Sequence, residues 1–393
     1  MFRVLGLCLM LLSSGVTHSM SLRIATFNAS MDGSNYVARG EKPNGQELPA
    51  RLAHGNELQI KNVAEIIQTV RPDILLINEF DYIGDTEKGV RAFIRRYLNV
   101  AQQKQKAIDY PYFFVAPVNT GVDSGLDLDK DGKASGVAGD AFGFGYYPGQ
   151  YGMVVLSRFP ILSDNIRTFQ HFLWRDMPNA LLPTIKDEQG VDWYSQEAQD
   201  VLRLSSKSHW DVPIRIDDKT IHVLASHPTP PVFDGKENRN GKRNHDEVRF
   251  WNDYLHGAKQ PKTAEYIYDD KGGKGGFRGE RFVVMGDLNA NPDEGDSYGE
   301  AIGDLLNHAM VNKLVLPESA GGKQAKPENQ FASSHTAGWG MRADYVIPAK
   351  IGLEVTGSGV FWPTKQSEQQ RLIANRKASS DHRLVWIDVQ LID

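Results

Sequence analysis

Short apolar segments that end in polar, chemically capable residues recur along most of this 393-residue chain. In chain order they span residues 22–28, 74–79, 153–156, 221–227, 282–289, 343–347 and 384–387. Apolar runs of this length, rich in Val and Ile, predict buried strands. Residues 57–70 instead place apolar side chains at helical spacing and stop before Pro72. The pattern predicts an α/β enzyme whose site lies at strand ends.

Three stretches between these segments are predicted to be long loops. Residues 119–150 are rich in Gly and Asp, residues 228–244 in Pro, Asn, Arg and Gly, and residues 269–279 contain Gly-Gly-Lys-Gly-Gly. None has the character of an interdomain linker, because strand signals continue on both sides. We therefore expect one domain over residues 21–393.

The first 20 residues are predicted to be a cleaved signal peptide. Arg3 precedes an apolar run from Val4 to Leu12, and small and polar residues follow it. The run is too short to span a bilayer. The alternative is a frayed strand or a short buried helix. We expect a secreted or periplasmic protein whose mature form lacks cysteine, because Cys8 is the only cysteine.

The overall charge argues against a protein that binds a polyanion through an extended basic surface. The formal net charge is −5, whereas such proteins usually carry a basic face. Any nucleic-acid contact is therefore expected to be local.

The strongest single motif is Val284-Met-Gly-Asp-Leu-Asn-Ala290. Strand alternation would place Asp287 and Asn289 on one face and turn Leu288 toward the core. A carboxylate beside an amide can orient water and hold a phosphate oxygen or a metal ion. The alternative is a capped turn, because Asp and Asn are common turn residues.

Other strand ends carry similar side chains: Asn28, Glu79, His227, Asp344, and the pair Asp381 and His382. Hard oxygen ligands suit Mg²⁺, Mn²⁺ or Ca²⁺. Each residue alone could be an ordinary turn residue. Together, two histidines with several carboxylates and amides, and no cysteine, indicate metal-assisted attack of water on a phosphoester.

The order Asn, Glu, His, Asp-x-Asn, Asp, Asp-His resembles the endonuclease/exonuclease/phosphatase superfamily, with its deoxyribonuclease and sphingomyelinase branches. The resemblance runs from Leu22 to Val389, and Met153 to Ile161 matches a structural strand motif of that family. It implies a four-layer α/β sandwich, with two packed mixed β-sheets flanked by helices. It also implies a divalent-metal-dependent phosphoric ester hydrolase.

The resemblance further implies a metal site. Glu79 would be the main ligand of Mg²⁺ (or Mn²⁺), helped by Asn28 and Asp381. Many nucleases of the family carry a carboxylate two residues after the first Asn, and this chain has Ser30 there. The departure favours a single-metal site centred on Glu79.

The catalytic roles are likewise implied by the resemblance. Asp287 would orient or deprotonate the attacking water, and Asn289 would contact the phosphate. His382, held by Asp344, would stabilise the phosphoryl oxygens. His227 would be a second imidazole on the phosphate.

An acidic loop offers a second cation site. Asp127, Asp129 and Asp131 precede Gly132 with the spacing of the first half of an EF-hand loop, but the twelfth position is Ala138. A true EF-hand is therefore not expected. The remaining readings are a Ca²⁺-stabilised loop and a solvated acidic turn.

Arginines of the 228–249 region are candidates for substrate binding. Arg239, Arg243 and Arg249 could hold a phosphate bidentately. The alternative is a set of structural ion pairs with neighbouring acids. Residues 247–255 have apolar side chains at helical spacing and predict a helix that faces the core.

These observations predict an exported phosphodiesterase, with a nuclease favoured by family size alone. The alternatives are a sphingomyelinase-like enzyme, a phosphatase of small phosphate esters, and a non-catalytic secreted binding protein on the same fold. The substrate partner would be a nucleic acid, a phospholipid headgroup or a small phosphate ester. No protein partner is predicted, and we expect a monomer.

Overall fold

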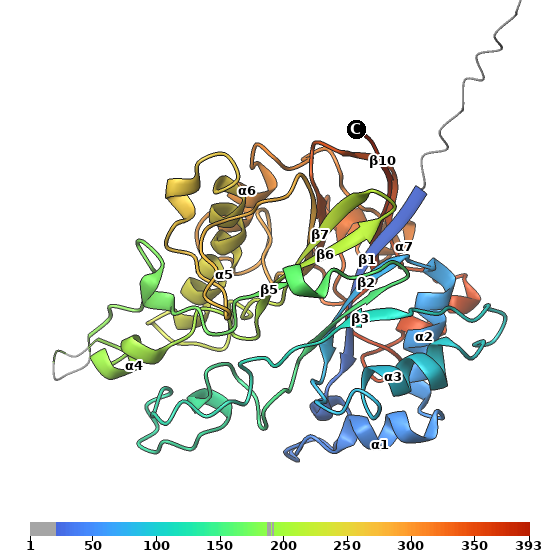
Figure 1. The fold of residues 1–393 in the computed structure, drawn as a ribbon. Helices are drawn as coiled ribbons and strands as arrows, with labels where there is room; N and C mark the ends of the chain where they lie inside the picture. The colour runs from blue at the N-terminus through green and yellow to red at the C-terminus, as the bar shows by residue number, and fades with distance from the viewer. Residues whose placement is uncertain (1–20, 187–189, 191) are drawn as a thin grey trace, which may run out of the picture.

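Two mixed β-sheets form the centre of the computed structural model, which describes residues 21–186, 190 and 192–393 (Figure 1). The predicted signal peptide lies outside the described residues. The first sheet has six strands in the order β10-β11-β1-β2-β4-β3. These strands are β1 (Ser21–Met31), β2 (Ile74–Phe80), β3 (Tyr112–Phe114), β4 (Met153–Ser157), β10 (Leu353–Val360) and β11 (Val385–Leu391). β1 pairs parallel to β2 and antiparallel to β11.

The second sheet has five strands in the order β5-β6-β7-β8-β9. They are β5 (Arg167–Thr168), β6 (His209–Ile216), β7 (Lys219–Ser226), β8 (Arg281–Asp287) and β9 (Asp344–Pro348). β7 and β8 are parallel, whereas β9 runs antiparallel to β8. Two neighbouring parallel strands and their antiparallel partners therefore occur at the centre of each sheet.

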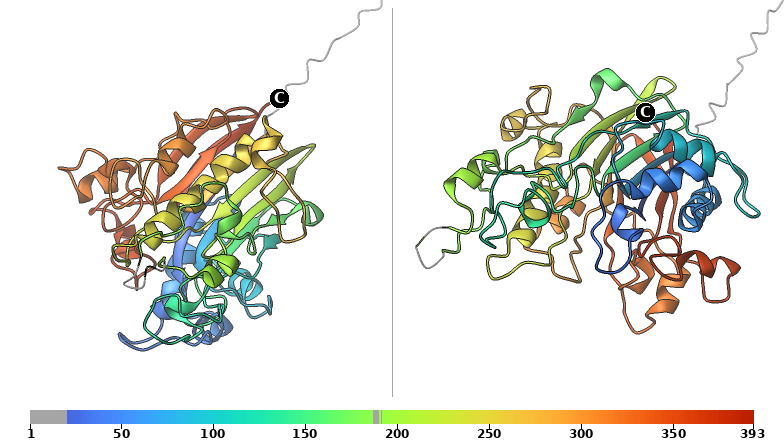
Figure 2. Two further views of the ribbon diagram at one scale, coloured as in Figure 1. Left: turned by 90° about the vertical axis from the view of Figure 1, so that its left-hand side faces the viewer. Right: turned by 90° about the horizontal axis from the view of Figure 1, so that it is seen from below.

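Helices cover the outer faces of both sheets. The first sheet is flanked by α1 (Glu47–His54), α2 (Leu58–Val70) and α3 (Val90–Phe93), and a π-helical turn (Ile94–Leu98) continues α3. The second sheet carries the long α5 (Arg239–His256), which lies across its outer face in Figure 2. Short helices α4 (Gln196–Val201), α6 (Ala301–Leu306) and α7 (Ala320–Ala325) complete the set. The described residues contain no helix that is both long and apolar enough to cross a membrane.

Strand alternation divides the core into two parts. Ile24 and Leu76 belong to the core between the sheets, whereas Phe27 and Ile77 belong to the core under α2. Both faces of β1 and β2 are thus buried, which explains their near-continuous apolar sequences. Each such side chain contributes roughly 1.5–3 kcal/mol by leaving water. The predicted four-layer sandwich is confirmed.

The predicted strands and the helix over residues 57–70 are found, with small shifts at their ends. Residues 119–150 are irregular except for a 3₁₀ turn (Ala138–Asp140), as expected. The loop predicted over residues 228–244 is wrong at its end, because α5 begins at Arg239. The first turns of α5 are polar and therefore lack an apolar repeat. They are held by Asn244, whose amide donates to the carbonyls of Thr229 and Leu288 at 2.8 and 2.9 Å.

β3, β5 and β10 have no counterpart in the sequence prediction, and neither has β6. Its sequence contains Pro213, which normally argues against a central strand. Pro213 is tolerated because it lies beyond the short β5, and its carbonyl accepts a hydrogen bond from Leu162 N at 2.9 Å.

Candidate active site

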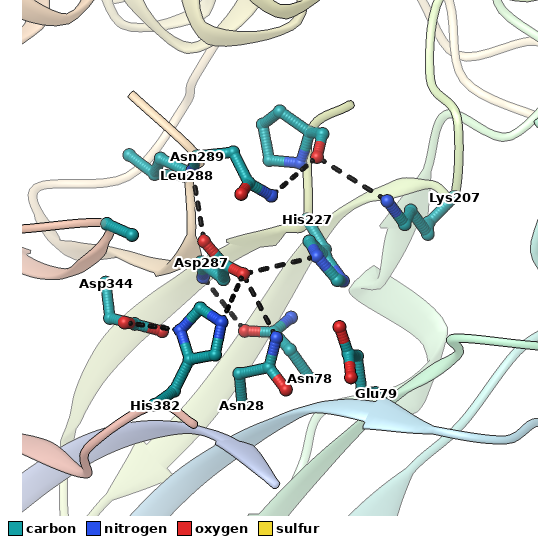
Figure 3. Close-up of polar contacts among 12 residues, drawn as sticks. Asn28, Asn78, Glu79, Lys207, His227, Asp287, Leu288, Asn289, Asp344 and His382 are labelled. Atoms are coloured by element: carbon teal, nitrogen blue, oxygen red, sulfur yellow. Dashed lines mark hydrogen bonds and ion pairs between the residues drawn. The ribbon is translucent and has the colours of Figure 1, made fainter. Parts of the chain in front are cut away.

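Polar side chains from both sheets meet at one end of the sandwich (Figure 3). β1, β2, β7 and β8 finish at this end, and the antiparallel β9 and β11 begin there. An antiparallel strand starts where its neighbour stops, so residues far apart in sequence share one edge. Asn28, Glu79, His227, Asp287 and His382 come together in this way, as the strand-end pattern predicts.

Asp287 lies at the centre of the cluster and joins the two sheets. Its Oδ2 accepts a hydrogen bond from Asn28 Nδ2 at 3.0 Å, and its backbone N–H donates to Asn78 Oδ1 at 3.0 Å. The preceding Gly286 has φ of 144°, and a Cβ there would lie 1.9 Å from the carbonyl oxygen of Ser226. Only glycine fits this approach of β8 to β7.

Two imidazoles approach the same carboxylate oxygen. His227 Nε2 lies 3.4 Å and His382 Nε2 lies 3.6 Å from Asp287 Oδ2. His382 Nδ1 lies 2.9 Å from Asp344 Oδ2, which also accepts a hydrogen bond from Thr336 Oγ1 at 2.7 Å. The predicted pairing of Asp344 with His382 is therefore present as a contact.

The charges within this buried group determine its protonation. Burial alone would raise the pKa of Asp287, but the charge of His382 and the hydrogen bond from His227 hold it well below its usual range. Burial opposes protonation of His382, yet Asp344 and Asp287 raise its pKa to about 10. Burial, helped by Lys207, lowers the pKa of His227. The group therefore holds an ionised Asp287 between a protonated His382 and a neutral His227.

Asn289 reaches the cluster by a different route from the predicted one. β8 ends at Asp287, and Asn289 has a left-handed φ of 50°, so strand alternation does not orient it. Its backbone N–H donates to Asp287 Oδ1 at 3.1 Å, and its Nδ2 donates to Pro228 O at 3.2 Å. Leu288 is buried, as expected.

Lys207 is a charged residue at the site that the sequence analysis missed. It is buried, and its Nζ lies 3.5 Å from the same Pro228 carbonyl that Asn289 contacts (Figure 3). Burial lowers the pKa of its ammonium group, while Glu247 and Asp287 act in the opposite direction. It follows Ser-Ser in a segment without any motif, so no sequence signal indicates it.

Glu79 lies at the edge of the cluster with a left-handed φ of 54°, a backbone conformation that is costly for this residue type. Its Oε2 accepts a hydrogen bond from Arg376 Nη2 at 3.0 Å, and the same nitrogen donates to Asp32 Oδ2 at 3.0 Å. Ser30, which stands where many nucleases have a carboxylate, donates to Asp381 Oδ1 at 3.2 Å. A carboxylate is nevertheless supplied nearby, by Asp32.

One buried group at this end of the sandwich could hold a metal ion. Asp287, Asp344 and His382 each offer one atom, and these atoms lie within 4.8 Å of one another. A metal there would have to displace the proton that His382 shares with Asp344. The set around Glu79 contains hard oxygens, and it already surrounds a cationic group, the guanidinium of Arg376. Oxygen atoms of this kind are the ligands that Mg²⁺ and Mn²⁺ prefer.

The acidic loop is arranged differently from the predicted EF-hand-like spacing. Asp127, Asp129 and Asp140 bring carboxylate oxygens within 4.8 Å of one another, whereas Asp131 accepts a hydrogen bond from Lys133 N at 2.9 Å. Asp140 in turn accepts backbone hydrogen bonds from Leu128 and Ser135 at 2.8 and 2.9 Å. The third carboxylate of the group is therefore Asp140 and not Asp131.

The three candidate arginines make structural contacts. Arg239 pairs with Glu237, and Arg243 donates to the carbonyls of Leu204, Phe142 and Arg203. Arg249 donates to the carbonyls of Pro178 and Asn179. These contacts favour the structural alternative over phosphate binding.

A comparison with protein families covers nearly the whole chain. The sequence matches the Endonuclease/Exonuclease/phosphatase family over residues 25–382. The chain belongs to this family. Members of the endonuclease/exonuclease/phosphatase family are metal-dependent phosphoester hydrolases, so membership supports a hydrolase. No curated protein matches the sequence.

The solved structures to which this chain is similar have low sequence identity and TM-scores below 0.5. An endonuclease/exonuclease/phosphatase from Beutenbergia cavernae has 15% identity and a TM-score of 0.47, covering 94% of this chain and 72% of its own. The human Nocturnin catalytic domain with bound sulfate has 15% identity and a TM-score of 0.46, covering 95% of each chain. A beta toxin mutant from Staphylococcus aureus with bound magnesium has 15% identity and a TM-score of 0.43, and the match covers 95% of this chain and 100% of the toxin chain.

Proposed function

We propose that this protein is an exported, divalent-metal-dependent phosphodiesterase that hydrolyses its substrate by in-line attack of water. The observation that carries the proposal is the convergence of Asn28, His227 and His382 on Asp287 Oδ2. An ionised carboxylate that accepts a hydrogen bond from Asn28 and lies against two imidazoles is held in one orientation, as a group that positions a nucleophile must be.

The proposed catalytic role of each residue follows from its charge. Asp287 would orient the attacking water, and Asn289 would contact a phosphate oxygen. The cationic His382, supported by Asp344, would stabilise the charge that develops on the phosphoryl oxygens. A bound Mg²⁺ or Mn²⁺ at Glu79, Asn28 and Asp381 would supply further charge stabilisation.

His227 favours a diester over a monoester. His227 lies across Asp287 Oδ2 from His382 and can contact the second substituent of a phosphodiester. Lys207 adds a buried positive charge on the same side, through the carbonyl of Pro228. We favour a nuclease-type substrate within this class by family analogy alone.

A substrate panel tests the proposal. Plasmid DNA, RNA, sphingomyelin, bis-(p-nitrophenyl) phosphate and p-nitrophenyl phosphate would be incubated with Mg²⁺, with Mn²⁺ and with EDTA. We expect metal-dependent turnover of a diester, reduced about a thousandfold or more in Asp287→Ala. Asp218→Ala removes a carboxylate whose side chain is 86% exposed, and serves as the matched control.

The outcomes separate the alternatives. Cleavage of sphingomyelin alone would identify a sphingomyelinase-like enzyme, and cleavage of the monoester alone a phosphatase. No turnover with any metal, together with no metal binding, would support a non-catalytic binding protein. Equal activity in EDTA and Mg²⁺ would contradict the metal-dependent mechanism.

Export is proposed from residues 1–20 only. Expression of the full chain in a bacterial host, followed by N-terminal sequencing of the protein recovered outside the cytoplasm, tests it. We expect an N-terminus close to Ser19 or Ser21. Recovery of an intact N-terminus at Met1 in the cytoplasm alone would argue against a signal peptide.

A further inference from the structure

One guanidinium group joins three acidic side chains at the edge of the candidate active site. Arg376 Nη2 donates to Asp32 Oδ2 and to Glu79 Oε2, each at 3.0 Å, and Arg376 Nε lies 3.9 Å from Asp381 Oδ1. The acidic residues come from three separate places: just after β1, near the end of β2, and just before β11. Arg376 is therefore a shared counter-ion for this end of the first sheet.

The carboxylates need such a cation because they are largely removed from water. The Asp32 side chain has no exposed area and that of Glu79 is 15% exposed. A further buried carboxylate, Asp81, lies close enough for its pKa to be raised by burial and by Asp32. Buried carboxylates of like charge repel one another unless a positive charge lies among them. The ion pairs described for Asp32 and Glu79 are both made by Arg376.

Arg376 itself is held mainly by charge. It lies in a turn between a 3₁₀ helix (Glu368–Ile373) and β11, and its side chain is 40% exposed. Its Nε is enclosed but has no hydrogen-bond partner in the described structure. Glu79 is the largest contribution that raises the pKa of this guanidinium. A side chain held in this way can leave when another cation takes over the same carboxylates.

We propose that Arg376 competes with the divalent cation for Glu79, so that metal binding requires the guanidinium to move away. The inference rests on the metal site of the proposed function. A guanidinium and a divalent ion that both lie against the Glu79 carboxylate repel each other, so each lowers the apparent affinity of the other. Arg376 thus weakens metal binding and keeps the metal-free carboxylates neutralised.

A direct metal titration tests the competition without any activity measurement. Mn²⁺ binding to the metal-stripped full chain would be followed by calorimetry and by electron paramagnetic resonance of free Mn²⁺. We expect Arg376→Gln to tighten the Kd by about tenfold, because the change removes one partly exposed cation that pairs with three carboxylates. Arg376→Lys keeps the charge but loses the forked guanidinium that reaches two carboxylates. Its Mn²⁺ Kd should therefore lie between those of the wild type and Arg376→Gln.

Arg371→Gln is the matched control. Arg371 lies five residues earlier and pairs with Glu65 at 2.5 Å, away from the described cluster. The Arg371→Gln substitution also removes one positive charge from this segment. We expect its Mn²⁺ Kd to stay within about twofold of the wild-type value. Glu79→Gln should abolish tight binding in the wild-type and in the Arg376→Gln backgrounds alike.

The effect of Mn²⁺ on the Tm difference between variant and wild type provides a second readout, because the loss of a purely structural arginine would lower the Tm equally with and without metal. Without metal, Arg376→Gln should have a lower Tm than the wild type, because three carboxylates lose their counter-ion. In saturating Mn²⁺ the difference should disappear, because the metal replaces the guanidinium. For Arg371→Gln the Tm difference should be the same with and without Mn²⁺.

The results separate this inference from the proposed function. An Mn²⁺ Kd that is unchanged or weaker in both Arg376 variants overturns the competition, even if phosphodiester hydrolysis depends on metal. Tighter binding in Arg376→Gln with no hydrolysis of any substrate supports the competition and rejects the proposed activity. Failure of Mn²⁺ to bind the wild type and every variant overturns both.

Discussion

His382 Nδ1 and Asp344 Oδ2 are 2.9 Å apart, and the other carboxylate oxygen, Asp344 Oδ1, is buried with no hydrogen-bond partner among the described residues. The carboxylate therefore directs its charge at the imidazole, and Thr336 Oγ1 holds it in place at 2.7 Å. This arrangement fixes the ring so that Nε2 points toward Asp287. The pair supports the imidazolium that we assign to phosphoryl stabilisation.

Asp344→Asn should leave the protein folded and lower kcat for the preferred diester about a hundredfold, because the amide no longer supports a cationic His382. Thr336→Val removes one hydrogen bond to Asp344 and should lower kcat by about tenfold. Steady-state kinetics would give both values, and circular dichroism would check folding. A full kcat in Asp344→Asn would show that the pair is structural.

Lys207→Met should separate activity from stability. A buried ammonium whose described hydrogen bond is 3.5 Å long costs stability, so an apolar side chain of similar length should leave the unfolding free energy unchanged or raise it by about 1 kcal/mol. The same change should lower kcat/KM about a hundredfold by removing a phosphate-facing charge. Urea unfolding and kinetics measure the two effects, with the exposed Lys313→Met as control. Parallel losses of stability and activity would contradict this assignment.

Gly286→Ala should disrupt the approach of β7 to β8. The new Cβ would lie 1.9 Å from the carbonyl oxygen of Ser226, at a φ of 144° that side chains disfavour. We expect a loss of about 3 kcal/mol or more in unfolding free energy, measured in urea. Gly272→Ala is the control, since its φ is also positive but its Cβ would meet nothing within 4 Å. Equal losses in the two variants would mean that backbone conformation, and not the close approach, sets the cost.

His209 should make the stability depend on pH. Its Nδ1 and Nε2 contact Ser205 Oγ and the carbonyl of Glu247 at 2.6 and 2.8 Å, and burial lowers its pKa from 6.5 to about 4. Its neutral form is favoured in the folded state, so this contribution is complete above the unfolded-state pKa and is lost as the pH falls toward the folded-state value.

The expected loss from His209 is about 2 kcal/mol of unfolding free energy between pH 7 and pH 5. His209→Gln should flatten this pH dependence by that amount, whatever its effect at neutral pH. Urea unfolding at the two pH values measures the slope, and the exposed His54→Gln serves as control. An unchanged slope in His209→Gln would show that other groups cause the acid sensitivity.

The sequence alone determined seven of the eleven described strands and the identity of most site residues. Alternation and apolar runs depend only on a few neighbouring residues. For this reason β1, β2, β7 and β8 could be predicted, together with the polar residues at their ends. The same local reasoning failed for β6, whose Pro213 is tolerated because it lies beyond the end of the short β5. It failed also for the start of α5, whose first turns lack an apolar repeat.

Only the tertiary structure decided which of these residues touch. Asn28 and Asp287 lie 259 positions apart, and they meet because the packing of two sheets brings the ends of β1 and β8 together. Lys207 and Arg376 belong to segments without periodicity, so their burial and charge partners depend on that packing. A local pattern specifies a strand and its two faces. The burial of both sheets against each other selects the strand order, and hence the charges that surround each carboxylate.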